Sequence, residues 1–187
     1  DGVIEPGSLD KLYDRFDGSN IVSGREVPVP GNSFTEALID KWRSTHDRIC
    51  RYSSRFSTHL GILPAGLVDR FPKDILDDIY IEWRARKKGL EREYVEEAVK
   101  YHHMPGSLYF FYRQQLKNWK GRLYAEERGY THSKPAGLLA ETFLEEAKNS
   151  PVSELPETVS LALIEAAAYI AAVISGGDPP KRWYRPG

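Results

Sequence analysis

The sequence predicts an all-α fold, either an irregular bundle or a short degenerate α-solenoid of about five to six helices. Three observations lead to this prediction. Apolar residues recur at intervals of three or four along most of the chain, which is the helical period. Gly and Pro separate these segments as helix ends and starts. No segment shows the sustained alternation of a half-buried strand. We divide the chain into an extended N-terminal arm over 1–32, a helical domain over 33–177 and an extended C-terminal tail over 178–187.

The predicted arm is rich in Gly and Pro and has little periodicity. Ser8 is expected to cap one short turn of helix. Pro28 and Pro30 each push the preceding residue toward extended geometry. We therefore expect an arm that lies across its own domain or across a neighbour.

The first long helix is predicted to begin at Ser33. Ser33 and Glu36 have the spacing of a capping box, in which each side chain bonds to the other residue's backbone N–H. One apolar stripe follows for roughly 25 residues, until Gly61 and Pro64 end the helix. Its members are Phe34, Leu38, Trp42, Ile49, Tyr52 and Phe56.

Two more helices are expected, one over 72–89 and one from near Glu91 to 104, where Pro105-Gly106 ends it. Together they would form a helical hairpin of the size found in α-solenoids, although no second copy recurs. The stripe predicted for the second of them consists of Val95, Ala98, Val99 and His102.

A fourth helix is predicted from Ser107 to about Arg128, and a fifth from Ser133 to the loop before Pro151. On the fourth, one stripe is expected in the core, and the stripe beside it is basic with an aromatic residue at each end. The core stripe comprises Leu108, Phe111, Tyr112, Gln115 or Leu116, Trp119 and Leu123. The basic–aromatic strip comprises Tyr109, Arg113, Lys117, Lys120 and Tyr124.

The last helix, over 156–175, is apolar nearly all round and contains six Ala residues. Such a helix is expected to be buried on every side. A membrane span is the competing interpretation, but the apolar run is about 16 residues where a bilayer needs about 20, and it contains Glu165. We therefore favour a buried helix over a span.

The bulk composition excludes several classes of protein. A net charge of −1 and a pI near 6.6 give no general bias toward nucleic acid or membrane surfaces. A single Cys cannot form an internal disulfide, which favours a reducing, intracellular setting. The first residue is Asp1 rather than Met, so removal of a presequence would suit a mitochondrial or other organellar location.

The sequence contains no catalytic, metal-binding or cofactor-binding motif that we can identify, so we predict no enzyme and no cofactor. His46 and Cys50 have a spacing that suits two metal ligands, but a site needs three or four. His102 and His103 would point about 100° apart on a helix. An enzymatic interpretation would need a pocket lined by His102 and two carboxylates.

Charge is separated along the chain. Residues 98–125 contain five Lys or Arg and no carboxylate, whereas 136–180 contain seven Asp or Glu and one Lys. The basic strip therefore meets either the acidic last third of the same fold or an acidic partner.

These observations favour a non-catalytic accessory or structural subunit that binds protein neighbours within a larger assembly. The alternative is an RNA-binding or nucleocapsid-like protein, in which Arg48, Arg51 and Arg55 would join the basic–aromatic strip around a phosphate backbone. The predicted partner-binding residues are Tyr109, Arg113, Lys117, Lys120, Tyr124, Trp183 and Tyr184.

Overall fold

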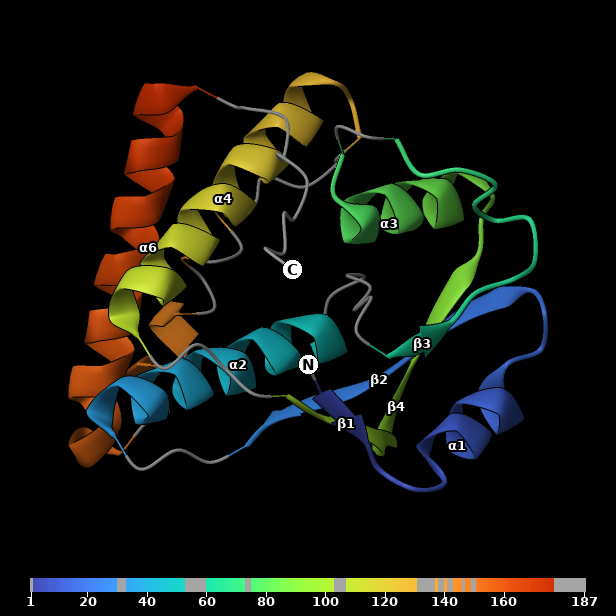
Figure 1. Ribbon diagram of the computed structural model, residues 1–187, viewed down its shortest axis with the longest axis horizontal. Coiled ribbons are helices and arrows are strands. Elements are labelled where there is room, and N and C mark those ends of the chain that lie inside the picture. The colour runs from blue at the N-terminus through green and yellow to red at the C-terminus, as the bar shows by residue number, and fades with distance from the viewer. Residues whose placement is uncertain are drawn as a thin grey trace, which may run out of the picture. The chain divides into compact units, whose positions relative to one another are not determined.

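The computed structural model describes residues 2–29, 33–52, 60–72, 75–102, 107–130, 137, 140, 143–145, 147–148 and 151–176 (Figure 1). Its elements are β1 (Gly2–Ile4), α1 (Ser8–Arg15), β2 (Asn20–Pro28), α2 (Phe34–Tyr52), β3 (Gly61–Ile62), α3 (Asp77–Lys87), β4 (Glu91–His102), α4 (Leu108–Glu127), the 3-10 turn η1 (Val152–Glu154) and α6 (Leu155–Ser175). The chain forms two compact units. The first comprises 1–69 and 81–106, and the second comprises 70–80 and 107–187.

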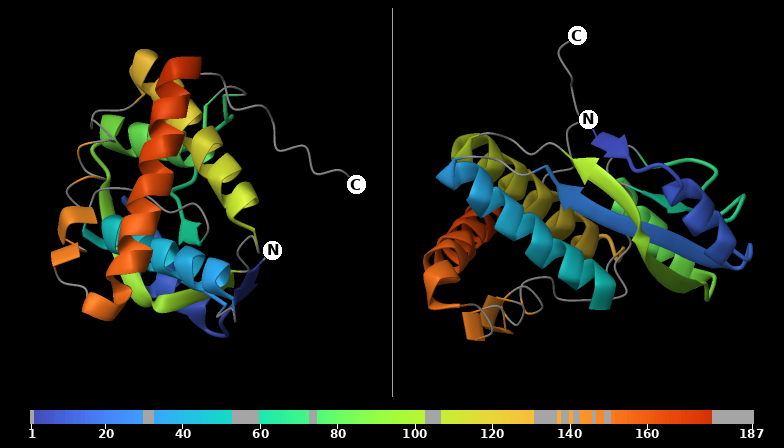
Figure 2. Two further views of the ribbon diagram at one scale, coloured as in Figure 1. Left: turned by 90° about the vertical axis from the view of Figure 1, so that its left-hand side faces the viewer. Right: turned by 90° about the horizontal axis from the view of Figure 1, so that it is seen from below.

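The first unit contains a four-stranded mixed sheet, so the all-α prediction is wrong. The strand order is β1-β4-β2-β3, with β2 and β4 parallel and the two short edge strands antiparallel to their neighbours. Figure 2 shows β2 and β4 side by side as the two long strands. Residues 2–28, expected in an extended arm, supply two of the strands and α1.

Helices lie on both faces of this sheet. Successive residues of β2 point to opposite faces, so neighbouring side chains pack against different helices. Val22 packs toward α1, and Ile21 packs toward the part of α3 that belongs to this unit. The cluster on the α1 side consists of Leu12, Val22, Leu60, Val95 and Ala98. The cluster on the α3 side consists of Ile21, Leu67, Ile81 and Ala85.

The pairing of β2 with β4 is interrupted by a large register shift. Gly24 pairs with Val95, but the next residue, Arg25, pairs with Val99. Strand β4 therefore uses three more residues than β2 at this point, which forms an extended bulge. A Cβ atom on Gly24 would lie 2.5 Å from the carbonyl oxygen of Ala98, so only Gly fits there.

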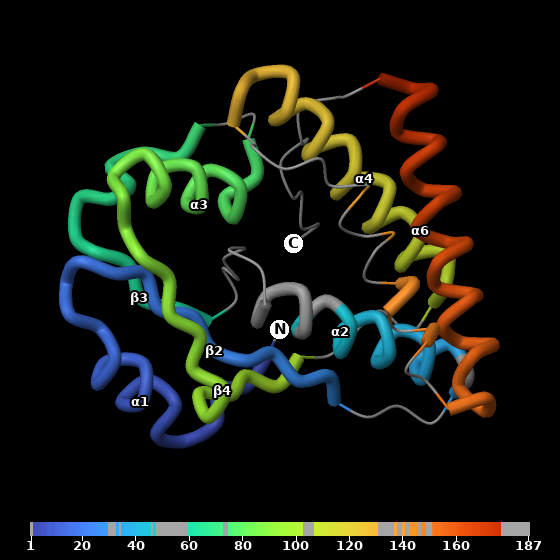
Figure 3. Tube along the Cα trace, turned by 180° about the vertical axis from the view of Figure 1, so that it is seen from behind, coloured from blue at the N-terminus to red at the C-terminus, as the bar shows by residue number. Residues whose placement is uncertain are grey.

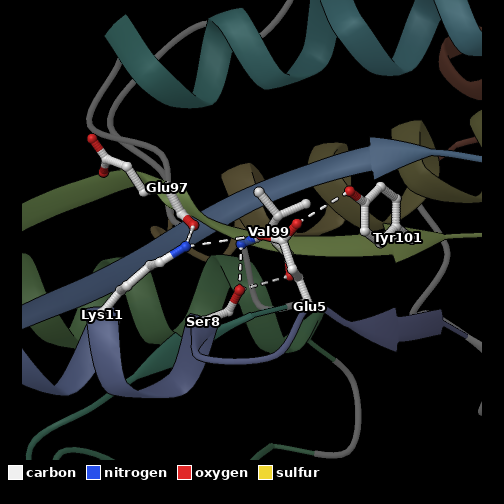
Figure 4. Close-up of polar contacts among 6 residues, drawn as sticks. All are labelled: Glu5, Ser8, Lys11, Glu97, Val99 and Tyr101. Carbon is white, nitrogen blue, oxygen red and sulfur yellow. Dashed lines mark hydrogen bonds and ion pairs between the residues drawn. The ribbon is translucent and has the colours of Figure 1, made fainter.

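Helix α1 bonds to the backbone of β4 within the bulge, at Glu97, and directly after it, at Val99 (Figure 4). The buried Ser8 hydroxyl accepts a hydrogen bond from the Val99 N–H at 2.8 Å and donates to the Val99 carbonyl at 3.2 Å. The Lys11 ammonium donates to the Glu97 carbonyl at 2.7 Å. The bulge and the start of α1 therefore stabilise each other.

The same bulge gives β4 a helix-like spacing of buried residues, which is why the helix predicted for this segment is wrong. In a regular strand Val95 and Ala98 would point to opposite faces, because their separation is odd. The extra residues turn both side chains into the same cluster. An i, i+3 spacing of buried residues, which is typical of a helix, is here produced by a bulged strand.

Several local helix predictions are confirmed. At the start of α2, the Ser33 N–H donates to the Glu36 carboxylate at 2.9 Å, and the Glu36 N–H donates to the Ser33 hydroxyl at 3.2 Å. Gly89, Gly129 and Gly176 follow α3, α4 and α6 with positive φ, which favours glycine at these helix ends. Of the predicted fifth helix the structure describes only 137, 140, 143–145 and 147–148, and these residues are helical.

The second unit is built on α4 and α6, which lie side by side with their chains running in the same direction (Figures 1 and 3). Trp119 of α4 packs on Ala168 and Ala172 of α6. The expectation that the last helix is buried on every side is wrong, because Leu163 and Ile174 of α6 are 65% and 81% exposed.

We expect Ser8→Ala to lower the free energy of unfolding by about 1–3 kcal/mol, because it leaves the Val99 N–H without its hydroxyl acceptor. Ser44→Ala is the matched control, since that exposed hydroxyl only donates to the Asp40 carbonyl of its own helix, and its effect should stay within about 0.5 kcal/mol. Urea unfolding followed by far-UV circular dichroism measures both. Equal effects would contradict the role given to Ser8.

We also expect Gly24→Ala to destabilise the first unit by about 1–3 kcal/mol, because the new methyl group would overlap the backbone of the bulge. Gly137→Ala is the control, since a Cβ there meets nothing within 4 Å. Amide hydrogen exchange in β2 and β4 should accelerate only in the first variant. Unchanged exchange in Gly24→Ala would show that the bulge adapts to a side chain.

Candidate functional site

Buried charged side chains gather where α2 packs on β2. Arg43 of α2 and Glu26 of β2 form an ion pair with a distance of 2.6 Å between Nη1 and Oε2, and their side chains are only 3% and 5% exposed. His102, at the end of β4, places Nδ1 3.6 Å from the other Glu26 oxygen. Side chains from β2, α2 and the end of β4 therefore meet in one polar group around the buried Glu26 carboxylate.

A second polar group lies further along α2. The Tyr94 hydroxyl of β4 donates to Asp47 Oδ1 at 2.5 Å. Arg25 of β2 lies between two carboxylates, 3.8 Å from Asp47 Oδ2 and 3.6 Å from Glu96 Oε1. Asp47 is buried, whereas the Arg25 side chain is 42% exposed, so this group reaches the surface on one side.

These contacts limit the chemistry that the first unit can perform. An imidazole beside a carboxylate can transfer protons, and His102 stands beside Glu26 as such a pair would. However, Glu26 is already bonded to Arg43 and shielded from solvent, which is typical of a structural ion pair. Among the described residues, no group of three or more His, Cys, Asp or Glu could hold a metal ion. The side chains of His46 and Cys50 lie outside the described part of the chain.

The contact between α4 and α6 contains one buried carboxylate. The Trp119 indole N–H donates to Glu165 Oε2 at 2.8 Å, and the Trp119 ring meets Tyr169 edge to face at 5.0 Å between ring centroids. Glu165, the most costly residue of α6 to bury alone, is thus hydrogen-bonded within the helix pair. Small Ala residues around it let the bulky indole approach the axis of α6.

The predicted basic–aromatic strip lies on α4 and divides into two parts. Tyr109 and Arg113 are exposed and contact each other, with Arg113 Nη1 3.2 Å from the Tyr109 hydroxyl, to which it donates. Lys117, Lys120 and Tyr124 are half-buried. Burial lowers the pKa of the Lys117 ammonium from its ordinary value. Trp183 and Tyr184 lie outside the described residues.

The feature that sequence reasoning missed is the outward face of α6, which is apolar and exposed. Val159, Leu163, Ala166, Ile170 and Val173 follow one another at steps of four, three, four and three. The buried residues facing α4 form a second series at steps of three, four, three and four. They are Thr158, Leu161, Glu165, Ala168 and Ala172. The sequence carries this signal as two interleaved heptad seams, which an all-round apolar helix does not distinguish from one continuous core.

The stretch Val152–Ser175 is also long and apolar enough to cross a membrane, judged by length and composition only. A second apolar surface lies at the start of α4, where Tyr109 and Phe110 are exposed and touch edge to face.

A scan against protein-family models and a search of curated proteins both find no match for this chain. The functional proposal therefore depends on the side chains and faces described above.

We expect Arg43→Ala to lower the free energy of unfolding by about 3–5 kcal/mol, because it removes the guanidinium that lies 2.6 Å from the buried Glu26 carboxylate. Arg25→Ala removes an exposed cation at longer distance and should cost at most about 1 kcal/mol. Urea unfolding of both variants provides the comparison. The double variant Glu26→Gln/Arg43→Met should lose less stability than Arg43→Ala, because it removes both charges. A larger loss in the double variant would show that the Glu26 charge left without the Arg43 guanidinium does not cause the destabilisation.

Proposed function

We propose that this protein is a non-catalytic subunit that binds a helix of a protein neighbour through the outward face of α6. One observation carries this proposal. Val159, Leu163, Ile170 and Ile174 are 52, 65, 55 and 81% exposed on a helix whose opposite face is already packed against α4. A contiguous apolar surface of this kind is typical of an interaction site.

The spacing of the exposed side chains favours a helix as the occupant. Steps of four and three place these side chains along a single seam of the helix. In helix pairs with such a seam, side chains of the second helix fit into the spaces between the side chains of the first. Ala166 and Ala167 are small residues in the middle of the seam, so a second helix axis could come close there.

Lipid is a weaker candidate for this surface. Helix α6 packs along α4, which carries Arg113, Lys117, Lys120 and Arg122. Each cation at the centre of a bilayer would cost about 2.5–3.5 kcal/mol or more. A helix pair with these charges therefore suits an aqueous assembly better than a bilayer.

RNA is also a weaker candidate. Binding along the basic–aromatic strip would require Lys117 and Lys120 to reach phosphates, yet both side chains are half-buried. The exposed part of the strip, Tyr109 and Arg113, provides one cation. Measurable RNA affinity that falls steeply with salt would favour this alternative over the protein partner.

The proposal predicts that Leu163→Glu/Ile170→Glu releases the chain from its native complex, because two carboxylates would be buried in the seam. The full chain, purified from its native source under mild conditions, should elute well above 21.3 kDa, and the double variant should elute as a monomer.

Val152→Glu is the matched control, since Val152 is 82% exposed and precedes α6, and this variant should stay in the complex. Circular dichroism of the purified variants verifies that each remains folded. A wild-type chain that elutes as a monomer, or a complex that survives Leu163→Glu/Ile170→Glu, would refute the proposal. Flotation of the wild type, but not of the double variant, with phosphatidylcholine vesicles would assign the face to lipid instead.

A further inference from the structure

We infer that α3 couples the folding of the two units, so that they unfold together. Residues 77–80 of this helix belong to the second unit, and residues 81–87 belong to the first. A loss of structure in either unit therefore removes support from the same helix. The coupling is a property of the chain itself and does not depend on what binds the outward face of α6.

The start of α3 contributes to the core of the second unit. Ile79 belongs to a buried cluster with Ile75, which lies just before the helix, and with Ala125 of α4. Leu76 lies against Gly121 of α4, where an added Cβ atom would be 2.8 Å from Leu76 Cδ1. Without the start of α3, the second unit would therefore lose several of the side chains that pack on α4.

The remainder of α3 contributes to the core of the first unit. Ile81 and Ala85 are buried in one cluster with Ile21 of β2 and with Leu67. Arg84 Nε also donates to the Leu67 carbonyl at 3.0 Å. Loss of this part of the helix would therefore expose the apolar residues on the α3 side of the sheet.

The two parts of α3 form one uninterrupted helix over Asp77–Lys87. Each N–H of an α-helix donates to the carbonyl four residues earlier, so the N–H groups of 81–84 need the carbonyls of 77–80. Ile79 and Ile81 lie about 200° apart around the helix axis, so they use different faces of the helix. A helix of 11 residues is marginal by itself in water. Packing in each unit therefore stabilises a helix that the other unit requires.

Native-state amide hydrogen exchange of the full chain tests the inference. Leu161→Ala truncates a fully buried side chain of α6 in the second unit. We expect the slowest amides of β2 and β4 to exchange faster by the same factor as those of α4 and α6, roughly 30-fold or more. Leu144→Ala is the matched control, since that side chain is 61% exposed, and exchange in both units should stay within about 3-fold.

A break in α3 tests whether this helix carries the coupling. Glu82→Pro removes the N–H that donates to the Asp78 carbonyl and places a ring against that carbonyl. Glu82→Ala keeps the helix and is the matched control, because both variants lose the ion pair with Arg86. Leu161→Ala should accelerate exchange in α4 and α6 alone when combined with Glu82→Pro, and in both units equally when combined with Glu82→Ala.

If Glu82→Pro does not fold, Glu82→Gly weakens the same junction without a clash. The acceleration that Leu161→Ala causes in β2 and β4 should then be smaller than the acceleration in α4 and α6.

Two results would overturn the inference. Acceleration confined to α4 and α6 in a chain with native α3 would show that the units open separately. Equal acceleration of both units in the variant with the broken or weakened helix would show that the coupling does not pass through α3. Because the purified chain is measured without a neighbour, neither result bears on the proposed function of α6.

Discussion

The sheet of the first unit depends on the register shift between β2 and β4, at which β4 contains three more residues than β2. The shift from the Gly24–Val95 pair to the Arg25–Val99 pair leaves residues 96–98 of β4 without a partner residue in β2. Around this point the backbone of β4 bonds to α1 instead, through Lys11 at Glu97 and through Ser8 at Val99. These bonds connect the N-terminal helix to a strand that lies more than 80 residues later. The bulge also directs Val95 and Ala98 into the same apolar cluster.

Buried polar groups in both units follow the same rule. Glu26 is paired with Arg43 of the neighbouring α2, and Glu165 accepts a hydrogen bond from the Trp119 indole of α4. Such contacts are costly to break and add specificity to packing that apolar contacts alone would leave loose. These charged side chains are buried and bonded within the fold, whereas the apolar residues on the outward face of α6 are exposed, and this is the surface to which we assign binding in our proposal.

The two faces of α6 differ in composition and in exposure. The inward face combines small Ala residues with one carboxylate and fits the large side chains of α4. The outward face combines larger aliphatic residues with two central Ala residues and is exposed. A helix with two heptad seams can join its own domain on one side and another helix on the other, which connects the stability of the unit to its proposed role in assembly.

The sequence by itself determined the local features of this protein. The Ser33–Glu36 capping box and the glycines after α3, α4 and α6 act within one turn of helix, so their outcome does not require the rest of the fold. The tertiary structure alone decided that residues 91–102 form a strand and that α6 is buried on one face. An i, i+3 spacing fits both a helix and a bulged strand, and only pairing with β2 distinguishes them. Likewise, apolar residues on both faces of a helix do not specify which face meets α4, because burial depends on the shape of the partner.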